Sequence, residues 1–241
     1  MIVTLATLVL GDILGKNIQY KIGNDEFVGY GAKPGKWKPG GPVVYVVQDW
    51  TGVDKHEEEV VENLAHLGYA AFAIDIYGKG VRPHSVKDCS AESGKYYAKP
   101  DLYMQRIMEG TKAFPTKGKK FFIGYCFGGS GVLEVARRNL GATGVVSFHG
   151  GLAPLSKAPA KINAKVVVLH GADDPFVDKK DVTGIQKEMK AAKSFKFVSY
   201  PGAVHAFTVK DMGFQVDGAK YNENADKKSW IELIKFLMAN A

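Results

Sequence analysis

Cys126 lies in a pattern of residues that could generate a reactive thiolate. The segment Gly124-Tyr125-Cys126-Phe127-Gly128 follows an apolar run and precedes a run with helical spacing. A strand that turns abruptly into a helix strains the residue at the turn, and small flanking residues avoid clashes there. The helix N-terminus favours a thiolate, and the backbone N–H of Phe127 is expected to point toward an oxyanion. The pattern predicts a cysteine nucleophile.

Two further groups follow along the chain in the order nucleophile, acid, base. One apolar run ends shortly before the adjacent acids Asp173 and Asp174, and another ends shortly before His205. An imidazole can take the thiol proton and later give it to a leaving group. A carboxylate fixes the tautomer of that imidazole. We therefore expect Cys126 and His205 to meet, with one of the two acids behind the imidazole.

Other interpretations of the two cysteines remain open from the residues alone. Most free cysteines are buried small hydrophobic residues, and Cys126 beside a glycine-rich turn fits that role. A redox sensor or acyl carrier is another interpretation, although the acid and the histidine downstream count against it. Cys89 lies in a predicted loop at 87–93 and is interpreted as structural.

The remaining histidines are expected to have structural or surface roles. His149 and His170 lie at the ends of predicted strands, where hydrogen-bonded packing is the commoner role. His56, His66 and His84 lie in helical or polar surroundings. No histidines, cysteines or acids have the spacing of a metal site, so neither a metal nor a cofactor is predicted.

The elements that must position these residues alternate between strands and helices. Most predicted strands are apolar throughout, which is typical of a parallel sheet covered on both faces. An antiparallel hairpin is expected to open it. Strands are predicted at 18–20, 26–30, 43–48, 69–75, 121–125, 144–148, 165–170 and 195–200, and helices at 54–67, from 100, and at 130–140, 181–192 and 226–239. We predict an α/β fold with functional residues at the carboxyl ends of the strands.

The composition limits the class of protein and the kinds of partner. The chain is 46% hydrophobic and 24% charged, which suits a globular protein with a sizeable core. No apolar run is long enough to cross a bilayer. The net charge is +7, but all but four of the 32 basic residues are scattered lysines. We expect a small-molecule substrate, no nucleic acid and no membrane span, and the sequence leaves the oligomeric state open.

Residues 1–15 form an apolar N-terminal segment of open status, and residues 16–241 are predicted to form a single domain. The segment lacks a basic start and a small-residue cleavage site, so it is a poor secretory signal. We expect a cytoplasmic protein, and an exported or periplasmic protein is the alternative.

The sequence resembles the dienelactone hydrolase family, cysteine hydrolases with an α/β-hydrolase fold, from about Ile18 to the C-terminus. The resemblance implies a triad of Cys126, Asp174 and His205. It makes Asp173 a loop or capping residue, and a reversal of the two acids is the alternative. The segments that carry the resemblance are DIYGKG at 75–80, GYCFGG at 124–129, VVSFHGGL at 145–152, VLHGADDPFV at 168–177 and YPGAVHAF at 200–207.

The resemblance also assigns residues around the reacting centre, and three of them depart from the family. It implies that the N–H of Trp50 is the second oxyanion donor, beside that of Phe127. Where the family has a glutamate that gates ionisation of the cysteine, this chain has the shorter Asp49. Of the two arginines that hold a substrate carboxylate in dienelactone-cleaving members, one matches Lys79 and the other matches Val209.

These departures favour a substrate other than a dicarboxylate-type lactone, although Lys79, Arg82 or Lys210 could compensate for the lost arginines. Tyr77, together with Trp50 and Phe127, could line an apolar pocket, and core packing is the alternative role for these rings. We predict hydrolysis of a small carboxylic ester or lactone through a thioester acyl-enzyme. The alternative is a ligand-binding module of the same fold with weak or no catalysis.

Overall fold

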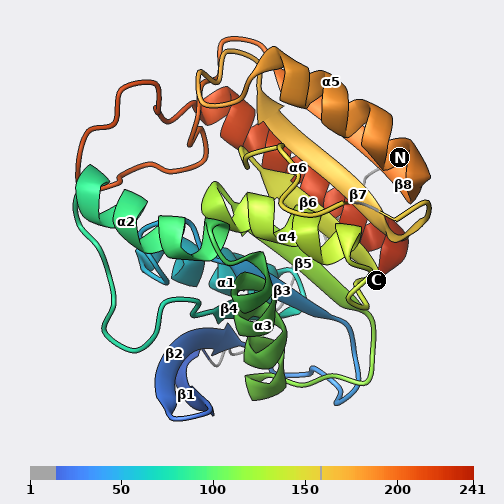
Figure 1. Cartoon of the computed structure of the whole chain (residues 1–241). Helices are drawn as coiled ribbons and strands as arrows, with labels where there is room; N and C mark the ends of the chain where they lie inside the picture. Colours follow the sequence, from blue (N-terminus) through green and yellow to red (C-terminus); the bar gives the residue numbers. More distant parts are fainter. Residues whose placement is uncertain (1–14, 158) are drawn as a thin grey trace, which may run out of the picture.

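The computed structural model, which describes residues 15–157 and 159–241, is built on one eight-stranded mixed sheet (Figure 1). The strand order is β1-β2-β4-β3-β5-β6-β7-β8. β1 and β2 form an antiparallel hairpin, β2 is antiparallel to β4, and the strands from β4 to β8 are parallel. The bounds are β1 Lys16–Ile22, β2 Asp25–Ala32, β3 Val43–Val47, β4 Ala70–Ile74, β5 Lys120–Tyr125, β6 Gly144–Phe148, β7 Ile162–Gly171 and β8 Ala192–Tyr200.

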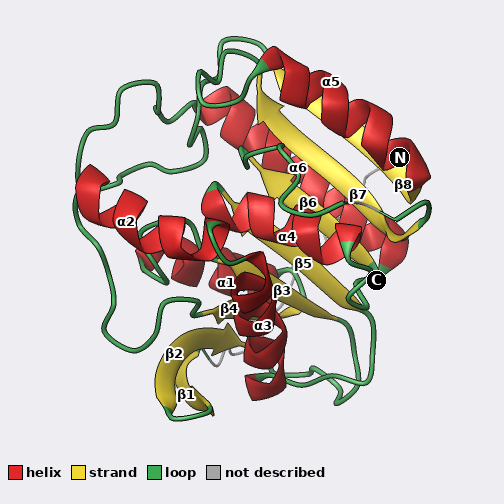
Figure 2. Ribbon diagram, in the orientation of Figure 1, coloured by secondary structure: helices red, strands yellow, loops and turns green. Residues whose placement is uncertain are grey.

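Helices cover both faces of this sheet, as the apolar strands predict (Figure 2). Helices α1 and α6 pack on one face, and α2, α3, α4 and α5 pack on the other. The helices are α1 Lys55–His66, α2 Val86–Tyr97, α3 Pro100–Gly110, α4 Phe127–Arg137, α5 Lys179–Glu188 and α6 Glu223–Asn240, with short 3-10 turns at Thr111–Ala113 and Met189–Ala191. The predicted α/β fold, with its mostly parallel sheet and opening hairpin, is confirmed. The apolar segment predicted over 1–15 lies, except for Gly15, outside the described residues.

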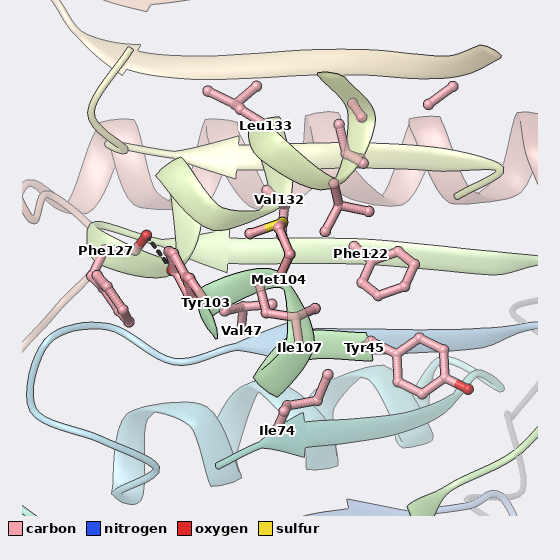
Figure 3. Close-up of a cluster of buried hydrophobic side chains, with 14 of the residues drawn as sticks. Tyr45, Val47, Ile74, Tyr103, Met104, Ile107, Phe122, Phe127, Val132 and Leu133 are labelled. Carbon is pink, nitrogen blue, oxygen red and sulfur yellow. Dashed lines mark hydrogen bonds between the residues drawn. The ribbon is translucent and has the colours of Figure 1, made fainter. Parts of the chain in front are cut away.

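The continuous apolar strands fill two cores because successive side chains point to opposite faces. In β3, Tyr45 and Val47 enter the core under α3 and α4, whereas Val44 and Val46 enter the core under α1 and α6. Figure 3 shows the first core, in which Tyr103 also donates a hydrogen bond to the carbonyl of Phe127 at 2.8 Å. No helix of the described residues has the length and apolar character needed to cross a membrane.

Helix α2 corrects the prediction of a loop around Cys89. Cys89 is fully buried in this helix, which begins after Ser85, whose hydroxyl accepts the backbone N–H of Asp88 at 3.1 Å. The buried face of α2 consists of Cys89, Ser93 and Tyr96. Because most of this face is small or polar, the segment lacks the apolar periodicity by which a helix is recognised.

Helix α4 begins at Phe127 rather than at Ser130, and all of its residues are buried. Its last residue, Arg137, is held by several acceptors. The guanidinium donates to the carboxylate of Glu188 in α5, with Nη2 2.9 Å from Oε2, and to the carbonyl of Leu152 at 3.0 Å. A guanidinium stays charged in proteins, so its burial requires such partners. The far end of α4 is therefore fixed to a second helix.

Candidate active site

Cys126 connects β5 to α4 through a sharply bent backbone. It has a φ of 51°, in the left-handed region that most side chains avoid. The two flanking glycines are required sterically. A Cβ on Gly124 would lie 2.2 Å from the carbonyl oxygen of Gly128, and a Cβ on Gly128 would lie 2.1 Å from that of Val47. The turn is therefore closed by backbone contacts that leave no space for a side chain.

The structure brings the three predicted residues together at the carboxyl ends of their strands. The Nε2 atom of His205 lies 3.1 Å from Sγ of Cys126, and its Nδ1 atom lies 2.8 Å from Oδ2 of Asp174. Asp174 is buried, whereas Cys126 is partly exposed. One imidazole thus joins a thiol and a carboxylate within hydrogen-bonding distance.

The two adjacent acids have different partners. Asp174 uses its second oxygen, Oδ1, to accept the backbone N–H of Phe176 at 2.9 Å. Asp173 is exposed and accepts the N–H of Gly202 at 3.0 Å, which steadies the turn before His205. The geometry therefore places Asp174 behind the imidazole and Asp173 on a loop.

The surroundings of His205 favour its protonated form. Burial alone would lower the pKa of this imidazole. The charge of an ionised Cys126 and the hydrogen bonds to Asp174 and Cys126 outweigh it and raise the pKa to about 10. An imidazolium beside a sulfur stabilises the thiolate, which is the nucleophilic form. The pair can therefore act as a nucleophile and a proton donor.

The two expected oxyanion donors are free to bind a ligand. Within the described part of the chain, neither the N–H of Phe127 nor that of Trp50 has a hydrogen-bond acceptor. Phe127 is the first residue of α4, where the N–H groups lack partners inside the helix. The carbonyl of Trp50 accepts the hydroxyl of Tyr77 at 3.2 Å. Tyr77 is buried, so its hydroxyl supports the Trp50 peptide.

Asp49 is buried behind Trp50 and is bonded to Thr51 rather than to the cysteine. Its Oδ1 accepts the backbone N–H of Thr51 at 2.7 Å, and the Thr51 hydroxyl lies 2.6 Å away. The same hydroxyl lies 2.8 Å from Oδ2 of Asp54. No hydrogen bond joins Asp49 to Cys126 among the described residues. The predicted gating contact is therefore absent from this arrangement.

A hydroxyl has one proton, so Thr51 cannot donate to Asp49 and Asp54 together. One of the two carboxyls must carry a proton for both short contacts to be hydrogen bonds. Burial raises the pKa of Asp49 to about 6, against an ordinary value of 3.8. Asp49 is therefore the natural proton carrier below about pH 6.

Glu57 completes this buried acidic cluster. Its carboxyl accepts the backbone N–H groups of Asp49 at 3.1 Å and of Asp54 at 3.2 Å. Burial, and then repulsion by Asp49, raise the pKa of Glu57 well above its usual range. The loop that carries Trp50 is thus shaped by hydrogen bonds to acids whose charge is disfavoured.

The residues that match the family's substrate clamp do not meet the cysteine. The ammonium group of Lys79 lies 2.9 Å from the carboxylate of Glu26, at the opening hairpin, and is half exposed. Val209 is buried. Among the described residues, neither side chain therefore forms a bond with Cys126: the lysine pairs with Glu26, and the valine has no polar group.

Two histidines differ from one another in how far the prediction holds. His149 is fully buried, and its Nε2 atom lies 2.8 Å from the hydroxyl of Thr208, as expected of a packing residue. Its ring lies 5.4 Å from that of His205, so it packs directly on the site. His56, predicted at the surface, instead packs edge-on against Tyr125 at 4.7 Å, and burial lowers its pKa to about 4.

The described surface also has a cleft of about 940 Å³ between α1 and α6. It is bordered by Tyr125 and Thr208, but Cys126, Asp174 and His205 do not line it. We therefore place the candidate active site at Cys126, Asp174 and His205 and not in this cleft, because the cleft contains no nucleophile bonded to a base. No group of three or more potential metal ligands occurs within residues 15–157 and 159–241.

Comparisons with known proteins identify the family that this chain resembles over most of its length. The sequence model described as "Dienelactone hydrolase family" matches residues 27–240. An uncharacterized protein of Caenorhabditis elegans is 34% identical over 141 residues, which cover 56% of this chain and 89% of that protein. A Salmonella typhimurium protein provisionally named a carboxymethylenebutenolidase is 25% identical, over 88% of this chain and 82% of its own.

A solved structure gives the same result for the fold. A dienelactone hydrolase-like promiscuous phosphotriesterase from metagenomic libraries superimposes with a TM-score of 0.87 at 28% identity. The match covers 95% of this chain and 99% of that one. The likeness therefore extends over nearly the whole length of both chains.

Proposed function

This chain belongs to the dienelactone hydrolase family and is a carboxylic ester or lactone hydrolase, and we propose that it acts through a thioester at Cys126. The observation that carries this proposal is the contact of His205 with Cys126 at 3.1 Å and with Asp174 at 2.8 Å. A nucleophile, a base and an orienting acid within hydrogen-bonding reach are the parts that acyl transfer requires.

The first half of the reaction forms the thioester. The sulfur of Cys126 attacks the substrate carbonyl carbon, and the carbonyl electron pair moves onto oxygen. The N–H groups of Phe127 and Trp50 bind this oxyanion. As it collapses, the bond from carbon to the leaving oxygen breaks, and His205 gives that oxygen its proton. An alcohol leaves, or a lactone ring opens.

The second half regenerates the thiol. His205, now neutral, takes a proton from a water molecule, and the hydroxide adds to the thioester carbonyl. The carbon–sulfur bond then breaks, and the carboxylic acid leaves while the pair of Cys126 and His205 is restored. Asp174 holds the imidazole in the orientation that both steps use.

The proposal is tested by intact-mass measurement after exposure to an activated phenyl ester. We expect the wild type to gain the mass of the acyl group, and Cys126→Ala to lose both this adduct and turnover by at least about a thousandfold. Cys89→Ala is the matched control, because that thiol is buried in α2, and it should still form the adduct. Retention of most turnover in Cys126→Ala contradicts the mechanism.

The alternative function is a ligand-binding module of the same fold. The buried Val209 at a position where the family has a clamp arginine, and the lack of a bond from Asp49 to the thiol, favour it. It predicts stoichiometric ligand binding by calorimetry with no acylated protein. Detection of the thioester excludes it.

A second candidate reaction is hydrolysis of phosphotriesters, because the neighbour at 28% identity is a promiscuous phosphotriesterase. The thiolate of Cys126 would attack phosphorus, expel an aryl alcohol and leave a phosphorylated sulfur. An aryl dialkyl phosphate triester in the same mass measurement tests this reaction.

A further inference from the structure

Phe176 keeps a large apolar surface in solvent directly beside the proposed base. Its side chain is 55% exposed, and its ring lies edge-on to that of His205, with centroids 5.1 Å apart. The bond from its N–H to Asp174 fixes it there. The acid that orients His205 therefore also holds this exposed ring.

Three further aromatic side chains surround the same centre and also keep exposed surface. Trp50 and Phe214 pair at 6.2 Å, and both are partly exposed. Tyr97 is 38% exposed, and its ring packs edge-on against that of Phe127 at 5.3 Å. We call Trp50, Tyr97, Phe176 and Phe214 the aromatic rim. They come from four separate segments, and exposed apolar surface gathered around a reactive group is typical of a ligand site.

The three cations named above as possible partners of a substrate carboxylate either have other partners or line the separate cleft. Lys79 pairs with Glu26, as described above. The guanidinium of Arg82 donates to the carbonyl of Val53 at 2.6 Å and to that of Val81 at 2.7 Å. Lys210 lines the separate cleft between α1 and α6. Within the described part of the chain, none of these three side chains forms a hydrogen bond or an ion pair with Cys126, Asp174 or His205.

The acids near the site also disfavour a negatively charged substrate. Asp174 lies directly behind His205, and Asp173 is its exposed neighbour. Burial raises the pKa of Asp49 only to about 6, so this group is largely ionised at neutral pH. A carboxylate on the substrate would therefore meet the charge of these acids, and the protonated His205 that could offset it is already paired with Asp174.

We propose that the substrate is an uncharged ester or lactone that carries an aromatic group, which packs on the aromatic rim. This inference rests on the proposed function, because the rim surrounds the proposed nucleophile. It departs from a carboxylate-bearing lactone, since Lys79 and Arg82 already have partners and Lys210 lines the separate cleft. Phe176 is the residue that contributes most to this specificity, because it presents the largest exposed fraction of the four.

The test uses two aryl acetates, one of which is neutral and the other anionic. They are the acetate of methyl para-hydroxybenzoate, which is neutral, and the acetate of para-hydroxybenzoic acid, which is anionic at neutral pH. Each kcat/KM is divided by the rate of hydrolysis by hydroxide, which removes the difference in leaving group. We expect the neutral ester to be preferred by about tenfold or more at low ionic strength.

Variants separate the rim from the reacting residues. Phe176→Ala is expected to raise KM for the neutral ester by about tenfold, with a smaller change in kcat, because the aromatic ring of the substrate loses its packing partner. Phe176→Leu keeps apolar bulk and should fall between the two. Ile231→Ala is the matched control, because Ile231 is 51% exposed and lies on α6. It should leave both constants unchanged.

Each outcome has one meaning. Equal normalised kcat/KM for the two esters, or an unchanged KM in Phe176→Ala, overturns the inference while the acyl adduct at Cys126 still forms. If neither ester acylates Cys126 and Cys126→Ala keeps its turnover, the proposed function is contradicted. The inference, which rests on it, is then contradicted as well. A neutral preference together with a KM effect confined to Phe176 supports it.

Discussion

Two turns that each follow a central strand frame the reacting centre, and they are held in opposite ways. The turn after β5, around Cys126, is closed by steric contacts between backbone atoms, with 2.1 Å separating a Cβ at Gly128 from its neighbour. The turn after β3, which carries Trp50, is shaped by hydrogen bonds to the buried acids Asp49 and Glu57. The conformation of the β5 turn depends on steric fit, and that of the β3 turn depends on the protonation state of buried acids.

This difference teaches how the two oxyanion donors should respond to conditions. Steric contacts do not change with pH, so the N–H of Phe127 keeps its direction as long as the protein is folded. The N–H of Trp50 follows a cluster whose charge changes near pH 6, because burial raises the pKa of Asp49 to about 6. The direction of the Phe127 N–H is therefore expected to be independent of pH, whereas that of the Trp50 N–H is expected to change near pH 6.

The largest expected effect is on the steric turn. Gly128→Ala would place a Cβ against the rigid carbonyl of Val47, and we expect it to lower the free energy of unfolding by at least about 3 kcal/mol. Gly184→Ala is the control, because this glycine lies in α5 with no atom within 4 Å. It should gain about 0.5–1 kcal/mol. Urea unfolding measures both variants, and equal effects would break the comparison.

The second effect is on the titratable turn. The pKa of Asp49 is about 6 in the folded protein and 3.8 ordinarily, so as pH rises the unfolded chain loses this proton first. The stability due to this group is therefore fully present below about pH 4, and up to about 3 kcal/mol is lost by the time pH has risen above about 6.

Asp49→Asn should remove that fall. The free energy of unfolding, measured with urea from about pH 4 to about pH 7, should decline less in this variant than in the wild type. Asp217→Asn, at an exposed position, should keep the decline of the wild type. Parallel curves for the wild type and Asp49→Asn would show that the β3 turn does not titrate in this range.

The smallest effect concerns the acceptor of the β3 turn. Glu57→Ala leaves the N–H groups of Asp49 and Asp54 without a partner, and we expect a loss of about 2 kcal/mol in the free energy of unfolding. Glu57→Gln keeps one acceptor oxygen and should cost about half as much. A glutamine variant as unstable as the alanine variant would mean that charge, rather than hydrogen bonding, holds this turn.

The sequence predicts most of the sheet and the approach of three residues because both follow from chain order. Apolar runs identify the buried strands, and the carboxyl ends of parallel strands meet at one edge, so Cys126, His205 and one of the acids Asp173 and Asp174 were expected to converge. The choice of Asp174 came from the resemblance to the family. The helix around Cys89 was missed because its buried face is small or polar. Local periodicity detects a helix only when that face is apolar.

Contacts between distant segments were beyond the reach of the sequence. The pairing of Lys79 with Glu26 joins residues far apart in the chain, so neither residue type nor spacing announces it. The same is true of His56 and Tyr125. Phe176 carried a weak signal, since it lies two residues after Asp174, but its exposure beside His205 depends on the loop conformation.

Arg137 connects the helix that follows Cys126 to the helix that follows the Asp174 loop. It ends the helix whose first turn follows the nucleophile, and it grips Glu188 at the end of the helix that follows the loop of Asp174. A loosening of this one guanidinium would let both helices drift. This remote guanidinium therefore couples the position of the nucleophile turn to that of the helix that follows the Asp174 loop.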